Sequence, residues 1–270
     1  MLQENVELNN GVKMPKIGFG TWQIENDVVV KPVLTALENG YIHLDSAYAY
    51  GNEKGVGEAV RNSGIPRETL FITTKIPAEV KTYEEAVAHI EASLKNLDLA
   101  YIDLMLIHAP KPWEEMAEGK HPYFEENRAV YRAMEEAYAA GKLKAIGVSN
   151  FDVADLENIL EICQVTPTVN QIRYHIGHTQ DEIVAFCEKH NIVIQAYSPI
   201  GTGKLLNNDN IKKVADKYGV SVAQICIKYV LQNNMIALPK SENPQRIAQN
   251  TQMDFTISID DMNDLNQLKL

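Results

Sequence analysis

Strand-like and helix-like segments alternate along nearly the whole chain, and this alternation limits the possible folds more than any other feature. Each strand candidate is a short apolar run bounded by turn residues, and patterns of helical period separate the runs. The strand candidates are Ile17–Phe19, Tyr41–Leu44, Leu70–Thr74, Leu104–Ile107, Lys144–Val148, Val169–Ile172, Ile192–Ala196 and Met235–Leu238. Because such alternation calls for a parallel sheet, eight strand-plus-helix units predict an α/β fold, a (β/α)8 TIM barrel.

The helical segments carry start and stop signals. Asp27 is expected to cap a helix that runs through about Glu38, and Asp152 is expected to cap a later one. The clearest amphipathic stripe consists of Tyr83, Ala86, Val87, Ile90, Leu94 and Leu97. No low-complexity linker separates the units, so residues 1–270 are expected to form a single barrel domain.

A hairpin signal precedes the first of these units. Asn9-Asn10-Gly11 lies between Val6–Leu8 and Val12–Met14, and asparagine and glycine tolerate the positive φ angles of a tight turn. We expect this N-terminal β-hairpin to close the bottom of the barrel.

The composition excludes several classes of partner. The formal net charge of −11 argues against a nucleic-acid surface, and any polyanionic cofactor would need a local positive charge. The chain begins without the basic and apolar segments of a secretory signal, and no uncharged stretch approaches the length of a membrane span. The cysteines Cys163, Cys187 and Cys226 are expected to be small hydrophobes in a reducing compartment. We therefore expect a cytoplasmic protein that contacts neither nucleic acid nor membrane.

Four proton-handling side chains follow predicted strands: Asp45, Tyr50, Lys75 and His108. The strands of a closed parallel barrel end on one rim, so these side chains can converge there. An ammonium group beside a phenol favours the phenolate, so Lys75 is expected to lower the pKa of Tyr50 and make it a better acid. Asp45 would keep Lys75 charged, and His108 would donate a hydrogen bond to a substrate oxygen.

Each of the four has an ordinary explanation when it is taken alone. Tyr50 is one of 12 tyrosines, Lys75 fits a surface position, and an isolated His108 fits a core histidine. An unpaired charge at the end of a buried strand is costly, however. Four such residues at strand ends are therefore better explained by a catalytic site than by packing.

Several stretches resemble the aldo-keto reductase family, in that family's order and across nearly the whole chain. They are Gly18–Trp22, His43–Glu53, Gly147–Phe151, Val169–Gln171, Ala196–Pro199 and Pro239–Ser241, followed by Arg246 and Asn250. The compact loop after Tyr197 and the short C-terminus resemble the bacterial branch that includes diketogluconate and methylglyoxal reductases.

The resemblance implies that Tyr50 is the general acid of a carbonyl reductase, supported by Asp45, Lys75 and His108, with NADPH as the hydride source. The implied cofactor site consists of Gly20, Thr21, Trp22, Ser149, Asn150, Gln171, Tyr197, Ser198, Ile200, Gly201, Lys204, Lys240, Ser241, Arg246 and Asn250. Within it, Ser149, Asn150 and Gln171 would hold the nicotinamide carboxamide, and Tyr197 would stack on the ring.

The other parts of the ligand are assigned in the same way. Ser198, Ile200, Gly201 and Lys204 would line the pyrophosphate passage. Lys240, Ser241, Arg246 and Asn250 would grip the adenosine end. Two cations and a hydroxyl among the last group suit a 2′-phosphate. The expected substrate pocket consists of Trp22, Tyr48, His108 and Trp113, together with the loop Ala109–Tyr123.

The chain departs from the family's pattern at four positions. Glu242 places a carboxylate near the expected 2′-phosphate, so NADH is also a possible cofactor. Ala109 stands where a tryptophan commonly follows the histidine, which predicts a less aromatic pocket wall. Arg173 and Ile176 stand where Glu and Pro are usual, which alters the charge at the rim.

Three other motifs do not match the nucleotide-binding or metal-binding patterns that they resemble. Gly51, Gly55 and Gly57 do not have the order of a dinucleotide fingerprint. Gly201–Lys204 lacks the spacing of a Walker loop and is expected to cover the cofactor. His175 and His178 lack the companions of a metal site, so no metal is expected.

Two functions of other classes remain open. Lys75 could form a Schiff base, as in an aldolase or related lyase on the same barrel. The protein could instead be a binding protein that senses the nicotinamide redox state with negligible turnover. For the reductase, aldehydes, ketones, α-dicarbonyls, keto acids and sugar-derived ketones all remain candidate substrates. A monomer is expected, and a dimer is an open alternative.

Overall fold

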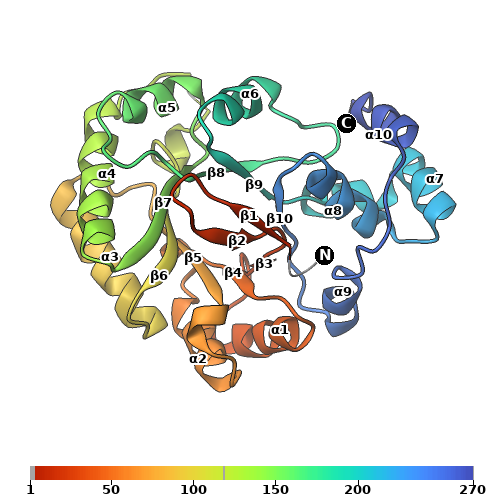
Figure 1. The fold of residues 1–270 in the computed structure, drawn as a ribbon, viewed down its shortest axis with the longest axis horizontal. Coiled ribbons are helices and arrows are strands. Elements are labelled where there is room, and N and C mark those ends of the chain that lie inside the picture. Colours follow the sequence, from red (N-terminus) through yellow and green to blue (C-terminus); the bar gives the residue numbers. More distant parts are fainter. Residues whose placement is uncertain (1–3, 118, 270) are drawn as a thin grey trace.

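Eight parallel strands form one continuous sheet in the computed structural model, which describes residues 4–117 and 119–269 (Figure 1). The strands are β3 (Phe19–Gly20), β4 (His43–Asp45), β5 (Phe71–Ile76), β6 (Ile102–Ile107), β7 (Leu143–Ser149), β8 (Val169–Arg173), β9 (Val193–Tyr197) and β10 (Ile236–Leu238). They neighbour one another in chain order. A parallel bridge between Ile17 and Ala237 joins the two edges, and the Gly18 N–H donates to Ala237 O over 2.9 Å. The predicted (β/α)8 barrel is confirmed.

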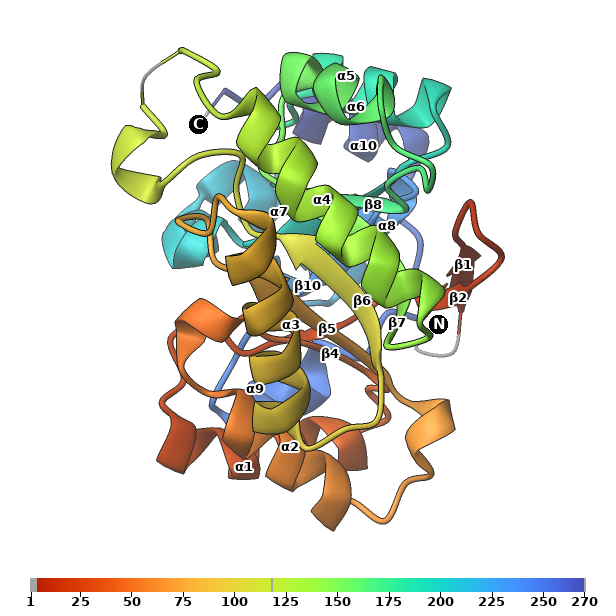
Figure 2. The same ribbon diagram turned by 90° about the vertical axis from the view of Figure 1, so that its left-hand side faces the viewer.

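Helices surround the outer side of the sheet (Figures 1 and 2). They are α1 (Asn26–Glu38), α2 (Glu53–Asn62), α3 (Tyr83–Leu97), α4 (Phe124–Ala139), α5 (Val153–Leu160), α6 (Asp181–Lys189), α7 (Asp209–Tyr218), α8 (Val222–Gln232), α9 (Pro244–Gln249) and α10 (Ile259–Asn266). Short 3-10 helices lie in the connections: η1 (Tyr48–Tyr50), η2 (Arg67–Thr69), η3 (Trp113–Glu115) and η4 (Gly201–Asn207). Sequence patterns assigned no range to α7, α9 or α10.

Local chemistry explains where several helices begin. The Asp152 side chain accepts a hydrogen bond from the N–H of Asp155 at 3.0 Å, so Asp152 caps α5 as predicted. The prediction for Asp27 is wrong, because Glu25 is the N-cap of α1 and Asp27 lies in the first turn. An acidic residue is favourable in either place, since both face the positive end of the helix dipole. On α3 the predicted stripe is largely buried, although Val87 remains 37% exposed.

The N-terminal hairpin consists of β1 (Asn5–Glu7) and β2 (Lys13–Pro15), which pair antiparallel as predicted. Its tip binds the amino-terminal ends of the barrel strands. The Asn9 side chain donates to Pro167 O at 3.0 Å and to Asn191 O at 3.2 Å, and the Asn10 side chain donates to Lys144 O at 3.0 Å. The hairpin therefore lies at the bottom of the barrel, opposite the segment between β6 and α4 (Figure 2).

Two clusters of buried apolar side chains form the core of the barrel. The larger one packs the outward-facing strand residues against the helices. The smaller one fills the barrel interior near the hairpin and consists of Leu8, Met14, Phe71, Leu104, Leu106, Ala145, Val169 and Ile236. Apolar side chains therefore fill the part of the barrel interior that lies next to the hairpin.

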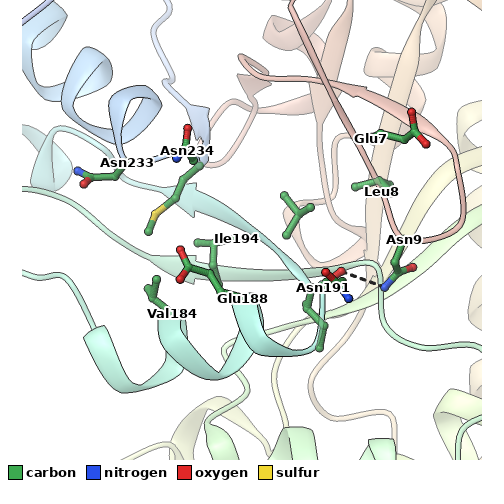
Figure 3. Close-up of a pocket in the computed structure, with 12 residues that line it drawn as sticks. Glu7, Leu8, Asn9, Val184, Glu188, Asn191, Ile194, Asn233 and Asn234 are labelled. Carbon is green, nitrogen blue, oxygen red and sulfur yellow. Dashed lines mark hydrogen bonds between the residues drawn. The ribbon is translucent and has the colours of Figure 1, made fainter.

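A surface hollow of about 520 Å³ lies at the hairpin end, between the hairpin, α6 and the starts of β9 and β10 (Figure 3). Asn9, Glu188 and Ile194 are among its lining residues, and Asn9 bonds the backbone of Asn191 across it. This hollow is at the opposite end of the strands from the predicted site, so it has no part in that site. Among the described residues, no helix is both long and apolar enough to cross a membrane.

Candidate active site

The Lys75 ammonium is at the centre of the predicted catalytic set and is fully buried. Its Nζ donates to Asp45 Oδ1 at 2.7 Å, to Ser46 O at 2.7 Å and, more weakly, to Tyr50 Oη at 3.5 Å. These bonds use all three hydrogens of an ammonium group. A Schiff base requires the lone pair of a neutral amine, so this arrangement does not favour Lys75 as a nucleophile.

The strands and one short turn bring these groups together. Asp45 ends β4, and Lys75 lies near the end of the adjacent strand β5, with both side chains inside the barrel. Tyr50 ends η1, where Gly51 follows with a φ of +68°, an angle that glycine adopts without strain. The buried Asn52 amide donates to Thr21 O at 2.9 Å, which fixes this turn to the strand beside it.

Two aromatic contacts connect His108 to the set. The His108 ring packs edge-on against Tyr50 at 5.6 Å between centroids and against Trp113 at 5.1 Å. His108 directly follows β6, and its N–H donates to Ile76 O on β5 at 3.0 Å. The structure therefore places Asp45, Tyr50, Lys75 and His108 in one cluster at the carboxyl-terminal rim.

Burial dominates the electrostatics of the cluster. It raises the pKa of Tyr50 well above the ordinary value, and the nearby Asp45 charge acts in the same direction. This differs from the expectation that the ammonium lowers the pKa of the phenol, because desolvation outweighs that attraction. Burial likewise lowers the pKa of Lys75, against the opposing effect of Asp45. Tyr50 thus keeps its proton at neutral pH until a strong base develops beside it.

His108 is a neutral imidazole at physiological pH, since burial, followed by the Lys75 charge, lowers its pKa to about 3. Its Nδ1 is buried and has no hydrogen-bond partner among the described residues. Nothing therefore fixes the ring proton at Nδ1, and the tautomer with hydrogen on Nε2 can donate to a ligand.

A chain of buried amides continues from Asp45 into the barrel. Gln171 Nε2 donates to Asp45 Oδ2 at 2.8 Å and to Gln195 Oε1 at 2.6 Å. The Gln195 amide nitrogen lies 3.4 Å from His43 Nε2, which in turn lies 3.2 Å from Thr73 Oγ1. The Asp45 carboxylate is thereby held on both oxygens, by Lys75 on one and by Gln171 on the other.

The residues predicted to hold a carboxamide lie at the ends of β7, β8 and β9. Ser149 Oγ donates to Gln171 O at 2.8 Å, and Asn150 Nδ2 donates to His108 O at 3.0 Å. Tyr197 Oη donates to Asn150 Oδ1 at 2.8 Å. One hydrogen-bonded group therefore joins these residues to the backbone of His108.

The predicted pyrophosphate loop follows Tyr197 directly. Ser198, Gly201, Thr202 and Gly203 all have positive φ angles, and η4 forms most of this loop. Lys204 is exposed on this loop, whereas Gly201 is buried against Leu205. Ile200 packs against the larger apolar cluster, which anchors the loop to the barrel.

The predicted adenosine end lies after β10. Lys240 is paired with Glu242 at 2.8 Å, so the carboxylate that departs from the family's pattern neutralises one of the two expected cations. Arg246 is exposed on α9 and forms no ion pair within the described part of the chain. Ser241 and Asn250 are buried at the start of the connection to α9 and at the end of that helix.

Two of the predicted pocket residues are partly exposed tryptophans. Trp22 is 47% exposed and Trp113 is 43% exposed, although both are large aromatic side chains. The Tyr48 ring stacks edge-on against His89 at 4.4 Å. Thr21 Oγ1 donates to Asp45 O at 3.0 Å, and the Gly20 N–H donates to Pro239 O at 3.0 Å. Thr21 and Gly20 are therefore hydrogen-bonded to neighbouring parts of the barrel.

Sequence patterns missed the residues that hold the loop after His108. Lys81 Nζ donates to Pro110 O at 3.0 Å and to Asn127 Oδ1 at 2.9 Å, and Asn127 Nδ2 also donates to Pro110 O at 2.7 Å. Farther along, His121 Nδ1 lies 3.0 Å from Asp155 Oδ1. No local signal marks these contacts, since their members are on different elements.

A closed parallel barrel with a buried ammonium, carboxylate, phenol and imidazole at its carboxyl-terminal rim defines a barrel enzyme. Comparisons with known proteins identify the class further. The model of the Aldo/keto reductase family matches residues 16–269. The chain belongs to this family and is an oxidoreductase.

Two curated relatives are similar over almost the full chain. The glyoxal reductase of Bacillus subtilis (strain 168) is 40% identical over 269 residues, which cover 99% of this chain and 93% of that protein. The aldehyde reductase YPR1 of Saccharomyces cerevisiae is 38% identical over 283 residues, covering 97% and 90%. A crystal structure of an aldo/keto reductase from Brucella melitensis is 40% identical and superposes with a TM-score of 0.91, covering 98% of this chain and 97% of that one.

Proposed function

We propose that this protein reduces a small aldehyde, ketone or α-dicarbonyl to an alcohol, with hydride from NADPH and a proton from Tyr50. The observation that carries the proposal is the buried Lys75 ammonium, which bonds Asp45 at 2.7 Å and approaches the Tyr50 hydroxyl at 3.5 Å. This geometry holds a phenol next to a fixed positive charge in a site from which water is largely excluded.

The protein's own groups manage the proton in this reaction. A bound NADPH would supply hydride to the carbonyl carbon, and negative charge would then develop on the carbonyl oxygen. The Tyr50 hydroxyl gives its proton to that oxygen, which becomes the alcohol. An alkoxide is a stronger base than a phenolate that lies beside the Lys75 ammonium, so the proton transfer would follow the hydride. Lys75 stabilises the resulting phenolate until solvent restores the proton.

His108 would orient the carbonyl. Since its ring is neutral, Nε2–H can donate to the substrate oxygen without adding a full positive charge beside Lys75. Trp113 packs edge-on against the same ring and would restrict its rotation. We propose that Trp22, Tyr48 and Trp113 form the walls of the substrate pocket.

The residues present suit a nicotinamide carboxamide. Gln171 uses both amide hydrogens on Asp45 and Gln195, and its Oε1 accepts no hydrogen bond from a described residue. A primary carboxamide offers N–H donors for such an oxygen. We therefore assign the carboxamide to Ser149, Asn150 and Gln171, the ring face to Tyr197, and the remaining predicted residues to the phosphates and adenosine.

The charge at the adenosine end supports use of both reduced nicotinamides. Lys240 and Arg246 suit a 2′-phosphate, but Glu242 already pairs with Lys240 at 2.8 Å. We propose that NADPH is the preferred cofactor and that NADH is also accepted, because Glu242 weakens the attraction for the extra phosphate.

The names of the relatives support the substrate class. Glyoxal is an α-dicarbonyl, and the yeast relative is named an aldehyde reductase. We propose that substrates of these two kinds enter between Trp22 and Trp113. We further propose that the whole chain acts as one barrel domain, as a monomer and in the cytoplasm, and its net charge of −11 supports the absence of a nucleic-acid partner.

Steady-state assays test the function directly. Oxidation of NADPH would be followed by its absorbance with glyoxal, methylglyoxal, an aromatic aldehyde and a simple ketone. We expect turnover with the dicarbonyls and aldehydes. No turnover with any of them, in a protein that binds NADPH, would reject the reductase in favour of a redox-sensing binding protein.

A further inference from the structure

Arg173 stands at the rim of the barrel beside Tyr197, where the family's pattern usually has a glutamate. On β8 the Asn170 side chain points outward to Cys187 on α6, whereas Gln171 points into the barrel and reaches Asp45. Since side chains on a strand alternate between its two faces, Arg173 points to the same side as Gln171. It is two residues farther along β8, at the end of the strand. It is paired in register with Tyr197 on β9, so it borders the predicted nicotinamide site.

The positive charge of Arg173 lacks a partner. No described carboxylate lies within ion-pair distance of it, and its Nε is buried without a hydrogen bond. Two residues farther on, His175 is only 7% exposed, and its Nε2 is also buried without a hydrogen bond. Buried polar nitrogens are nearly always paired, so the Arg173 Nε–H, which is always a donor, calls for an absent acceptor. The His175 Nε2 beside it becomes a second donor only when that ring is protonated.

The local backbone holds these side chains in place. His175 N–H donates to His178 O at 3.1 Å, and His178 N–H donates to His175 O at 2.8 Å. The two imidazole rings lie 5.4 Å apart. The Gln180 side chain donates to Arg173 O at 2.5 Å and closes the turn. The group is therefore positioned before any ligand arrives.

No negative charge compensates this cluster. Burial lowers the pKa of His175 and of His178, and the charged groups that lower them further are Arg173 for both and His178 for His175. No carboxylate is among the groups that act on either ring. The charged group that acts on both rings is therefore a cation, Arg173, in a chain whose net charge is −11.

We propose that Arg173, His175 and His178 form a binding site for an oxyanion, a carboxylate or phosphate group, at the rim beside Tyr197. Arginine binds such groups through two parallel hydrogen bonds. The preferred source is a carboxylate or phosphate on the carbonyl substrate itself, and in this respect the proposal rests on the proposed function. A free anion is the other source of the same chemistry.

Binding of the oxyanion is linked to protonation of His175. Its Nδ1 donates to Ile176 O at 2.8 Å, so Nε2 is a bare acceptor in the neutral ring and becomes a donor only when the ring takes up a proton. The titratable and charged groups facing His175 are Arg173 and His178, both of which oppose that proton. A bound anion offsets them, so affinity increases as the pH falls.

Phosphate binding to the protein alone tests the site without turnover. Inorganic phosphate would be titrated at about pH 6, near the ordinary pKa of histidine, and followed by the histidine C2–H resonances in NMR. We expect two histidine resonances to shift with saturation in the unmodified protein. Arg173→Gln should abolish the shifts and Arg173→Lys should preserve part of them. Arg132→Gln, which removes an exposed arginine on α4, is the charge-matched control and should change nothing.

Substrate discrimination identifies the source of the anion. The ratio of kcat/KM for 4-carboxybenzaldehyde to that for benzaldehyde should fall about tenfold or more in Arg173→Gln and stay constant in Arg132→Gln. Loss of phosphate binding with an unchanged ratio supports the site and assigns it to a free anion. Phosphate shifts that persist in Arg173→Gln, or that never occur in the unmodified protein, overturn the proposal. If no aldehyde is reduced, the proposed function fails while the phosphate titration still decides the site.

Discussion

Gln171 Nε2 lies 2.8 Å from Asp45 Oδ2, while Lys75 holds the other oxygen of the same carboxylate. A residue predicted to bind the cofactor is thus bonded to the carboxylate that orients the catalytic ammonium. Because the second hydrogen of that amide is bonded to Gln195, the side chain cannot rotate freely to meet a ligand. The carboxamide site and the proton-donating set are therefore one hydrogen-bonded unit.

Replacing Gln171 with leucine should disturb both parts of this unit. Asp45 Oδ2 and Gln195 Oε1 would lose their donor inside the barrel, which should reduce the free energy of unfolding by about 1–3 kcal/mol. NADPH affinity should fall as well. Urea denaturation and a fluorescence titration measure the two effects, with the exposed Gln267→Leu as control. Full stability together with unchanged NADPH affinity would show that the amide has neither role.

Tyr50→Phe tests the assigned proton donor. Removing one hydroxyl should lower kcat for aldehyde reduction by about 10²–10⁴-fold, because positioned acid catalysis is lost. NADPH affinity should stay nearly constant, since Tyr50 is not among the residues assigned to the cofactor. Tyr138→Phe on α4 is the control. An equal loss of NADPH affinity and of turnover would refute the role of proton donor.

Acid should destabilise the protein through two buried histidines. Burial lowers the pKa of His43 and of His108 from 6.5 to about 3. Between these values the unfolded chain binds a proton at each ring and the folded protein does not, so stability is lost as the pH falls below 6.5. The expected slope is about 1.4 kcal/mol per pH unit for each histidine. Urea denaturation across this pH range gives the free energy of unfolding at each pH. In His43→Gln, its slope against pH should be smaller by the contribution of about one proton.

His190→Gln supplies the control variant for that measurement, since His190 is a partly exposed residue at the C-cap of α6, where its ring packs against Phe186. A slope that is equal in His43→Gln and in the unmodified protein would mean that His43 is protonated in the folded state at mild pH.

Glu242→Gln tests the cofactor preference. Removing this carboxylate frees Lys240 from its ion pair, so NADPH should bind about two- to fivefold more tightly relative to NADH, the range expected for an exposed charge pair. Fluorescence titrations with both cofactors give the ratio, and the distant Glu157→Gln on α5 is the control. A constant ratio would place Glu242 away from the bound phosphate.

The sequence predicts the positions of the catalytic residues better than their interactions. Asp45, Lys75 and His108 follow or end apolar runs, and parallel strands of a barrel share a rim, so their convergence follows from topology alone. The chain of amides from Asp45 to His43 could not be predicted in this way. Gln171 and Asp45 are separated by 126 residues, and only the closed barrel brings them within bonding distance.

The electrostatics likewise depend on tertiary structure. A sequence argument can weigh Lys75 against Tyr50 as a charge pair, but the desolvation that raises the pKa of Tyr50 arises from neighbours on several strands. Helix caps also show that the sequence alone cannot predict such details. Asp27 and Glu25 are both acidic residues near the start of α1, and the backbone angles alone decide which one is the cap.

Lys81 is expected to position the loop that carries the pocket wall. Its bonds to Pro110 O and Asn127 Oδ1 fix the backbone two residues after His108 and three before Trp113. Lys81→Met should lower kcat/KM for aldehydes by about ten- to hundredfold, because small misplacements of a catalytic group are costly. NADPH affinity should not change, and the exposed Lys189→Met should match the unmodified protein.

A pH profile separates this positioning role from a general loss of structure. Burial lowers the pKa of Lys81 to about 8, so the ammonium becomes a weaker donor as the pH rises through that value. Activity should therefore fall above pH 8 in the unmodified protein. Arginine stays charged throughout this range, so Lys81→Arg should remove that decline. If the decline persists in Lys81→Arg, or if kcat/KM in Lys81→Met is normal, the loop is held by Asn127 without help from Lys81.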